Sequence, residues 1–146
     1  MKVRRGTPAD VRRALEIWRA AVDATHGFLT SEHRAEIDRL VAEQFLPNAE
    51  LWLAVDATDR PMGFLVMAGD MIDALFVDPA AHGQGFGTRL LDHAKTLTSA
   101  LTVEANEQAT NALPFYLRRG FEISGRTPTD QAGRPYPLVQ LRYRDG

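Results

Sequence analysis

The stretch that most constrains the fold is residues 71–97, where the sequence pattern changes twice within a few positions. Met71–Val77 is apolar and rich in β-favouring residues, and Pro79 ends that strand because it has no N–H for a sheet ladder. A helical pattern of apolar residues then runs to Leu97. Between the two patterns lie three glycines at alternate positions, Gly83, Gly85 and Gly87.

A strand, a glycine loop and a helix start together expose backbone N–H groups at the positive end of a helix dipole, which suits a phosphate or a diphosphate. The loop has neither the G-x-x-x-x-G-K-[ST] pattern of nucleoside triphosphatases nor the G-x-G-x-x-G pattern of dinucleotide sites. We therefore predict an anion-binding loop. Taken alone, a glycine turn that only lets the helix leave the strand is an equal alternative.

Composition limits the class of protein. A chain of 146 residues with 45% hydrophobic and 25% charged residues predicts a single domain over residues 1–146 with a real core. A net charge of -2 without long runs of one sign disfavours nucleic acid as partner. The absence of cysteine excludes disulfides, thiolate metal sites and a thiol-bound intermediate. No signal peptide or membrane-length apolar run is present, so we expect a cytoplasmic protein without a metal or a membrane partner.

The order of expected elements indicates an α/β (α+β) fold. Thr7 and Pro8 begin a first helix that ends near Gly27, and Ser31 caps a second one that Pro47 closes. A last helix starts late, near residues 110–111, because Pro114 is harmless only in a first turn. The strand at 101–104 follows a crossover helix and is therefore predicted to lie parallel to Met71–Val77. The strands are expected at 3–5, 51–55, 62–68, 71–77, 101–104, 121–126 and 138–144.

Two motifs within this order of elements resemble the GNAT superfamily of N-acetyltransferases, and in particular its small bacterial members. The family signature [RQ]-x-x-G-x-[GA] is matched by residues 82–87, with His82 in place of Arg or Gln, and F-Y-x-x-x-G-F is matched by residues 115–121. The resemblance covers essentially the whole chain. It implies the GNAT fold, a mixed, mostly antiparallel central sheet of about six or seven strands that splays between the fourth and fifth and is flanked by about four helices.

The resemblance also implies acetyl-CoA as acetyl donor. Its pyrophosphate would lie on the backbone amides of residues 83–88, and its pantetheine arm along one edge of the central strand, with an amide near Phe76 or Val77 as oxyanion donor. Many members have an asparagine where this chain has Ala109, and Asn106 is the nearest substitute. The coenzyme-binding residues so predicted are Leu75, Phe76, Val77, His82, Gly83, Gln84, Gly85, Phe86, Gly87, Thr88, Asn106 and Tyr116.

Tyr116 matches the family tyrosine that donates a proton to the departing thiolate, which makes it the predicted general acid. Without the motif, a core aromatic would be the better interpretation. The attacking amine needs a proton acceptor. Asp73 is the first candidate, with Glu104 and then His26 as possible acceptor-site base behind it. A solvent-facing strand residue is the alternative for Asp73, and a plain surface histidine for His26.

These features predict an N-acetyltransferase that moves acetyl directly to a primary amine of a small metabolite, a lysine or a peptide N-terminus. The acceptor is expected between residues 25–29, the second helix and residues 127–137. The alternatives are a coenzyme A-binding sensor that performs no chemistry and a nucleotide-binding module. We expect a monomer or a homodimer.

Overall fold

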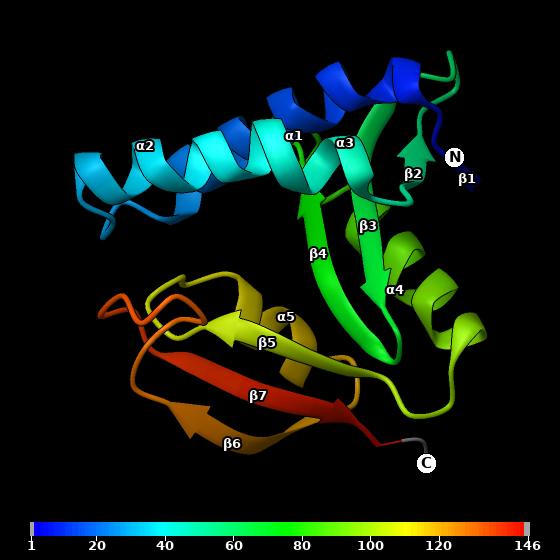
Figure 1. Ribbon diagram of the computed structural model, residues 1–146. Helices are drawn as coiled ribbons and strands as arrows, with labels where there is room; N and C mark the ends of the chain where they lie inside the picture. Colours follow the sequence, from blue (N-terminus) through cyan, green and yellow to red (C-terminus); the bar gives the residue numbers. More distant parts are fainter. Residues whose placement is uncertain (1, 145–146) are drawn as a thin grey trace.

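The computed structural model describes residues 2–144, whose seven strands form one mixed sheet in the order β1-β2-β3-β4-β5-β7-β6 (Figure 1). Every neighbouring pair is antiparallel except β4 and β5, which are parallel as predicted. The predicted GNAT fold class is thereby confirmed. The strands are β1 (Lys2–Arg5), β2 (Trp52–Val55), β3 (Pro61–Ala68), β4 (Met71–Val77), β5 (Thr102–Asn106), β6 (Phe121–Thr127) and β7 (Leu138–Tyr143).

Helices cover both faces of the sheet. The 3-10 turn η1 (Pro8–Asp10) leads into α1 (Val11–Thr25), and α2 (Ser31–Leu40) continues through the π-helical turn η2 (Val41–Phe45) into α3 (Leu46–Asn48). Of these, α1 packs on one face of β2–β4, and α3 packs against α1. The short turn η3 (Pro79–Ala81) precedes α4 (Phe86–Leu97), which packs on the other face, while α5 (Ala112–Leu117) packs on β5 and β6.

Two apolar cores result, one on each face. Phe64 on β3 joins the core beneath α1, and its neighbour Leu65 joins the core beneath α4, because successive strand residues point to opposite faces. Both side chains are fully buried. The sheet is thus fixed from both sides, and the loops at its ends are held in place.

The second helix differs from the prediction at both ends. Its N-cap is Thr30 and not Ser31, since the Thr30 hydroxyl accepts the His33 N–H at 3.1 Å. The helix also continues past Pro47. A proline there would clash with a carbonyl of a regular α-helix, but the turn before it widens, and the Leu46 N–H donates to the Val41 carbonyl five residues earlier. By contrast, α5 begins late as predicted, with Pro114 in its first turn.

Ion pairs fasten α2 alongside α1. The Asp38 carboxylate accepts hydrogen bonds from Arg19 at 2.8 and 2.9 Å and from Arg34 at 2.8 Å. Arg34 also pairs with Asp23 at 2.9 Å and lies over the ring of Trp18 at 4.9 Å. Because both helices are held, the loop between them has a fixed position.

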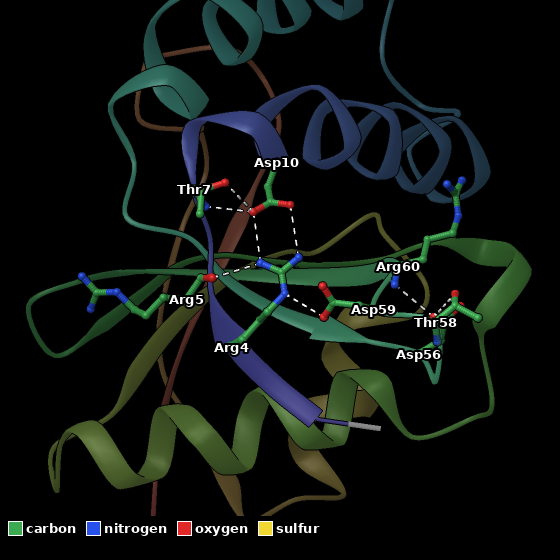
Figure 2. A network of polar contacts seen from close by, with 8 residues as sticks. All are labelled: Arg4, Arg5, Thr7, Asp10, Asp56, Thr58, Asp59 and Arg60. Atoms are coloured by element: carbon green, nitrogen blue, oxygen red, sulfur yellow. Dashed lines mark hydrogen bonds and ion pairs between the residues drawn. The ribbon is translucent and has the colours of Figure 1, made fainter.

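A second polar network secures the start of α1 (Figure 2). Arg4 on β1 donates to Asp10 at 3.1 Å and to Asp59 in the β2–β3 turn at 3.0 Å. Asp10 in turn accepts the Thr7 N–H at 2.8 Å. The turn itself is closed by Asp56, whose carboxylate accepts the N–H groups of residues 58 and 60. One arginine thus joins three elements that are far apart in the sequence.

Replacing Asp38 with asparagine is expected to lower the free energy of unfolding by about 1 kcal/mol at pH 7. The hydrogen bond from Arg19, with further help from Arg34, lowers the pKa of Asp38 from 3.8 to about 2. A depressed carboxyl pKa contributes stability above its unfolded value that is lost as pH falls. The difference between Asp38→Asn and wild type should therefore shrink between pH 4 and pH 2, as measured by urea unfolding at a series of pH values.

Asp92→Asn, at an exposed position on α4, serves as the matched control and should change the unfolding free energy little at any pH. An Asp38→Asn effect of constant size across this pH range would contradict the ion-pair explanation.

Candidate functional site

The site begins where β4 and β5 part. They are paired only at Met71 with Thr102 and at Ile72 with Val103. Beyond Ile72, β4 keeps its pairing with β3, and no strand of residues 2–144 pairs with its other side, while β5 continues along β7. Figure 1 shows the two strands close together at their starts and separating toward their ends. The predicted splay between the fourth and fifth strands is present.

A β-bulge in β4 lies at the point of separation. On β3, Val66 and Met67 are consecutive, but their partners on β4 are Ala74 and Ile72, so Asp73 is an extra residue without a partner. The bulge also changes which face the strand presents, because Ile72 packs in the core beneath α4 and Ala74 in the core beneath α1. Bulges bend a strand and redirect a side chain. Asp73 thus stands at the vertex of the gap.

A cleft of about 650 Å³ fills the gap between the strands. It extends from the glycine loop at one end, past α5, to the end of α1 at the other. Gln84 is the one predicted coenzyme residue that does not line it. The predicted residues that the fold brings together here are Leu75, Phe76, Val77, His82, Gly83, Gly85, Phe86, Gly87, Thr88, Asn106, Tyr116, Asp73, Glu104 and His26.

The glycine loop has the backbone geometry of an open cradle. Gly83 and Gly85 have φ of 80° and 90°, and a Cβ at either position would meet nothing within 4 Å. Gly85 is also the N-cap of α4, so the loop amides lie at the positive end of a helix of 12 residues. Its surface is therefore free to receive an anion.

Arg119 adds a cation beside this loop. Its guanidinium donates to the Thr88 hydroxyl at 3.0 and 3.2 Å and lies over the Phe115 ring at 3.9 Å. Gly87 permits the close approach of α4 and α5, because a Cβ there would be 3.3 Å from Phe115 Cε1. Sequence reasoning missed Arg119. Its position three residues after Tyr116, about one helical turn, was the signal that could have found it.

Tyr116 is buried like a core aromatic residue and also lines the cleft, while its role as general acid stays a prediction. It is 5% exposed and packs edge-on against Phe115 and Phe121, with ring centroids 5.2 Å away in each case, yet it also lines the cleft. Burial raises the pKa of its phenol well above the ordinary value. The hydroxyl therefore keeps its proton at neutral pH and can act as a donor.

The three candidate proton acceptors occupy different environments along the cleft. Desolvation raises the pKa of Asp73. Glu104 accepts one amide hydrogen bond at each carboxylate oxygen, from Gln131 and from Gln140, both at 2.8 Å. Burial lowers the pKa of His26, so its imidazole is neutral at pH 7.

Next to Tyr116 the cleft wall is apolar at the position where many GNAT proteins have asparagine. Ala109 is 2% exposed and contributes no polar side chain there. The Oδ1 atom of Asn106 already accepts the Gln108 N–H at 3.0 Å. Asn111, at the N-cap of α5, also lines the cleft and was not predicted.

The segments expected to form an acceptor site do come together. Tyr136, in the loop between β6 and β7, accepts the Thr30 N–H at 3.3 Å, touches the imidazole of His33 and lies 5.8 Å from the Phe28 ring. His33 and His93 are both partly buried on their helices. His33 contacts Tyr136, and His93 packs at 4.2 Å against Trp52 because α4 lies flat on the sheet.

Gly85→Ala is expected to destabilise the protein by about 1 kcal/mol, the cost of placing an L-residue in the left-handed region. Since the added Cβ would meet open space, the effect should come from the backbone alone. Gly27→Ala is the matched control, as it also enters open space but lacks a positive φ. Thermal unfolding of both variants tests this, and equal effects would contradict the strained-loop explanation.

The chain is similar to known proteins along most of its length. Residues 24–136 match the family described as "Acetyltransferase (GNAT) domain". The peptidyl-lysine N-acetyltransferase YjaB of Salmonella typhimurium is 46% identical over 143 residues, which are 98% of each chain. Among residues 2–144, no helix combines the length and apolar character needed to cross a membrane.

Solved structures show the same fold. The solution structure of apo-form YjaB from Escherichia coli has a TM-score of 0.93 and 42% identity, covering 99% of this chain and 98% of that one. The PaiA N-acetyltransferase of Thermoplasma acidophilum, solved in complex with coenzyme A, has a TM-score of 0.78 and 17% identity over 99% of this chain and 100% of that one.

Proposed function

Because the chain belongs to the GNAT acetyltransferase family, we propose that it moves the acetyl group of acetyl-CoA directly onto the primary amine of a lysine side chain. One observation carries this proposal. A single cleft contains the open glycine loop, the unpaired edge of β4 and the protonated hydroxyl of Tyr116. An acyl transfer from a phosphate-bearing thioester needs these three features together.

The donor end of the cleft fits coenzyme A. The loop amides at the start of α4 and the guanidinium of Arg119 would hold the pyrophosphate. The free backbone of Leu75, Phe76 and Val77 would pair with the pantetheine amides, since this side of β4 has no strand partner. Bound there, acetyl-CoA supplies a reactive thioester. The PaiA structure, which shares this fold, was solved with coenzyme A.

The residues around the thioester position can support each part of the transfer. A backbone N–H near Phe76 or Val77 would donate to the carbonyl oxygen as negative charge develops on it. The Tyr116 hydroxyl would donate its proton to the departing sulfur. A lysine amine, with a pKa of about 10.4, is almost wholly charged at pH 7 and must lose a proton before it attacks. Asp73, Glu104 and His26 are the proton acceptors available in the cleft.

The relatives support lysine as the acceptor. The YjaB protein that shares 46% of its residues with this chain is named a peptidyl-lysine N-acetyltransferase. Both carboxylates of the cleft, Asp73 and Glu104, suit a cationic side chain, and neither appears among the ion pairs of residues 2–144. A small metabolite amine and a peptide N-terminus share this chemistry and form the comparison substrates.

A coenzyme A sensor that performs no chemistry is the second candidate function. The observation that favours it is the apolar wall at Ala109, together with the engaged Oδ1 of Asn106, because both reduce the polar contacts offered to the coenzyme. A sensor would bind acetyl-CoA without consuming it.

Tyr116→Phe is expected to lower kcat by about 10²-fold or more while leaving acetyl-CoA binding unchanged, because only the proton donor is lost. The measurement is free thiol release from acetyl-CoA with lysine-containing peptides, the same peptides with acetylated lysine, and small amines.

Tyr143→Phe removes a phenol that lies outside the cleft and should keep wild-type kcat. If wild-type protein released no thiol with any amine but still bound acetyl-CoA, the enzyme proposal would fail and the sensor would stand.

Acetyl-CoA is expected to raise the melting temperature, because a ligand at 100 times its Kd stabilises the folded state by about 2.7 kcal/mol. ATP should produce no comparable shift if pairing of the pantetheine with β4 contributes to affinity. Thermal unfolding with each ligand over a concentration series tests this, and an equal shift with ATP would instead favour a nucleotide-binding module.

A further inference from the structure

Thr25 fixes the protonation of the ring next to it. The Thr25 hydroxyl donates its proton to the Ala21 carbonyl at 2.8 Å, an ordinary contact in the last turn of α1. The same oxygen lies 2.6 Å from Nδ1 of His26. A hydroxyl has one proton, and with that proton on the Ala21 carbonyl the Thr25 oxygen acts as an acceptor toward His26. On this basis we assign the imidazole proton to Nδ1, since the roles in the 2.6 Å contact follow the tautomer.

This tautomer leaves Nε2 of His26 with its lone pair. Within residues 2–144, Nε2 has no hydrogen-bond partner and is not among the polar atoms cut off from solvent. Both Thr25 and His26 line the cleft. The backbone is held as well, because the His26 N–H donates to the Val22 carbonyl at 2.7 Å, and Phe28 packs 5.2 Å from the ring. A basic nitrogen is thus available on a fixed ring whose residue lines the cleft.

We propose that His26 is the catalytic base that takes the proton of the attacking amine through Nε2, and that Thr25 is its positioning residue. The inference rests on the proposed acetyl transfer. A neutral imidazole suits this task, since a base works best when its pKa lies near the working pH, and burial keeps His26 neutral.

The protons balance in the resulting step. The lysine ammonium first loses one proton to solvent, which leaves a neutral amine. Its nitrogen then forms a C–N bond to the thioester carbonyl carbon, and the C–S bond breaks with its electron pair on sulfur. His26 Nε2 takes the second proton from that nitrogen, and Tyr116 gives one to the sulfur. The imidazolium returns its proton to the tyrosinate through water, which restores both residues, so the reaction releases one proton overall.

The two carboxyl groups of the cleft, those of Glu104 and Asp73, lie in environments that differ from that of His26. Each oxygen of Glu104 accepts a hydrogen bond from an amide, which orients the carboxylate. Asp73 stands at the bulge. In this scheme the two carboxylates attract the lysine ammonium and then stabilise the imidazolium. The other titratable residues that line the cleft are His82, Tyr116 and Arg119, while His33 and Tyr136 lie beyond Phe28.

Nitrogen-15 NMR of the imidazole tests the arrangement without any substrate. Wild-type His26 is expected to show the Nδ1–H tautomer. Thr25→Ser keeps the hydroxyl and should preserve it, whereas Thr25→Val keeps the branched shape and should shift the ring toward the Nε2–H form. A wild-type spectrum dominated by Nε2–H would overturn the proposal.

Enzyme kinetics test whether His26 acts as the base and Thr25 as its positioning residue. His26→Gln should lower kcat for a lysine peptide by about 10²-fold with an unchanged acetyl-CoA thermal shift, and Thr25→Val by about tenfold, with Thr25→Ser near wild type. As pH is lowered, the wild-type kcat/KM should decrease around the pKa of His26, which burial places below 6.5, because His26 must be neutral to accept a proton. This decrease on the acidic side of the pH profile, the acidic limb, should be absent in His26→Gln. His93→Gln, outside the cleft, is the control and should keep both kcat and the limb.

The outcomes separate this inference from the proposed function. If wild-type protein acetylates the peptide and His26→Gln keeps full kcat and the acidic limb, the inference is overturned and the acetyltransferase proposal stands. If wild-type protein acetylates no amine at all, both are overturned. A Thr25→Ser variant as slow as Thr25→Val would overturn the positioning role of the hydroxyl.

Discussion

The parting of β4 and β5 after two paired residues is the feature on which the site depends. A strand edge inside a protein normally needs partners for its N–H and C=O groups, because unpaired buried polar groups are costly. Here the bulge at Asp73 turns β4 away, and Leu75, Phe76 and Val77 are left with a free edge along a cleft. The two apolar cores hold β4 in this position from both faces. The unpaired edge thus persists because packing fixes it, and it is available to an extended ligand.

The charged groups at the two ends of the cleft have opposite signs. The start of α4, the glycine amides and Arg119 make the donor end positive. Asp73 and Glu104 place two carboxyl groups toward the region where the acceptor would enter, and His26 adds a neutral, desolvated imidazole. In the proposed reaction, a polyanionic donor and a cationic acceptor would therefore bind at different ends of the cleft, and their reactive groups would meet between these ends.

The two halves of the divided sheet are bridged at their open end. Tyr136 reaches from the loop between β6 and β7 to Thr30 and His33 at the start of α2. On the other side of the same loop, Arg134 pairs with Glu36 on α2 and with Asp130. The ion pairs of Asp38 fasten α2 to α1. These contacts hold the loop that carries His26 at a fixed distance from β5, so the width of the cleft is set by elements outside it.

The sequence by itself determined the positions of the strands along the chain, the parallel pairing of β4 with β5, the glycine loop, the late start of α5 and the place of Tyr116 in the chain. Each of these depends on local patterns, such as periodicity, a proline, or a short motif with fixed spacing. Only the tertiary structure decided the bulge at Asp73, the position of Arg119 on Thr88, the two amides on Glu104 and the widened turn before Pro47. The physical reason is range. The hydrogen bonds from Arg119 to Thr88 and from Gln131 to Glu104 span 31 and 27 residues, and the contact of His33 with Tyr136 spans 103. No local pattern records such contacts, because they form only when packing brings distant side chains together.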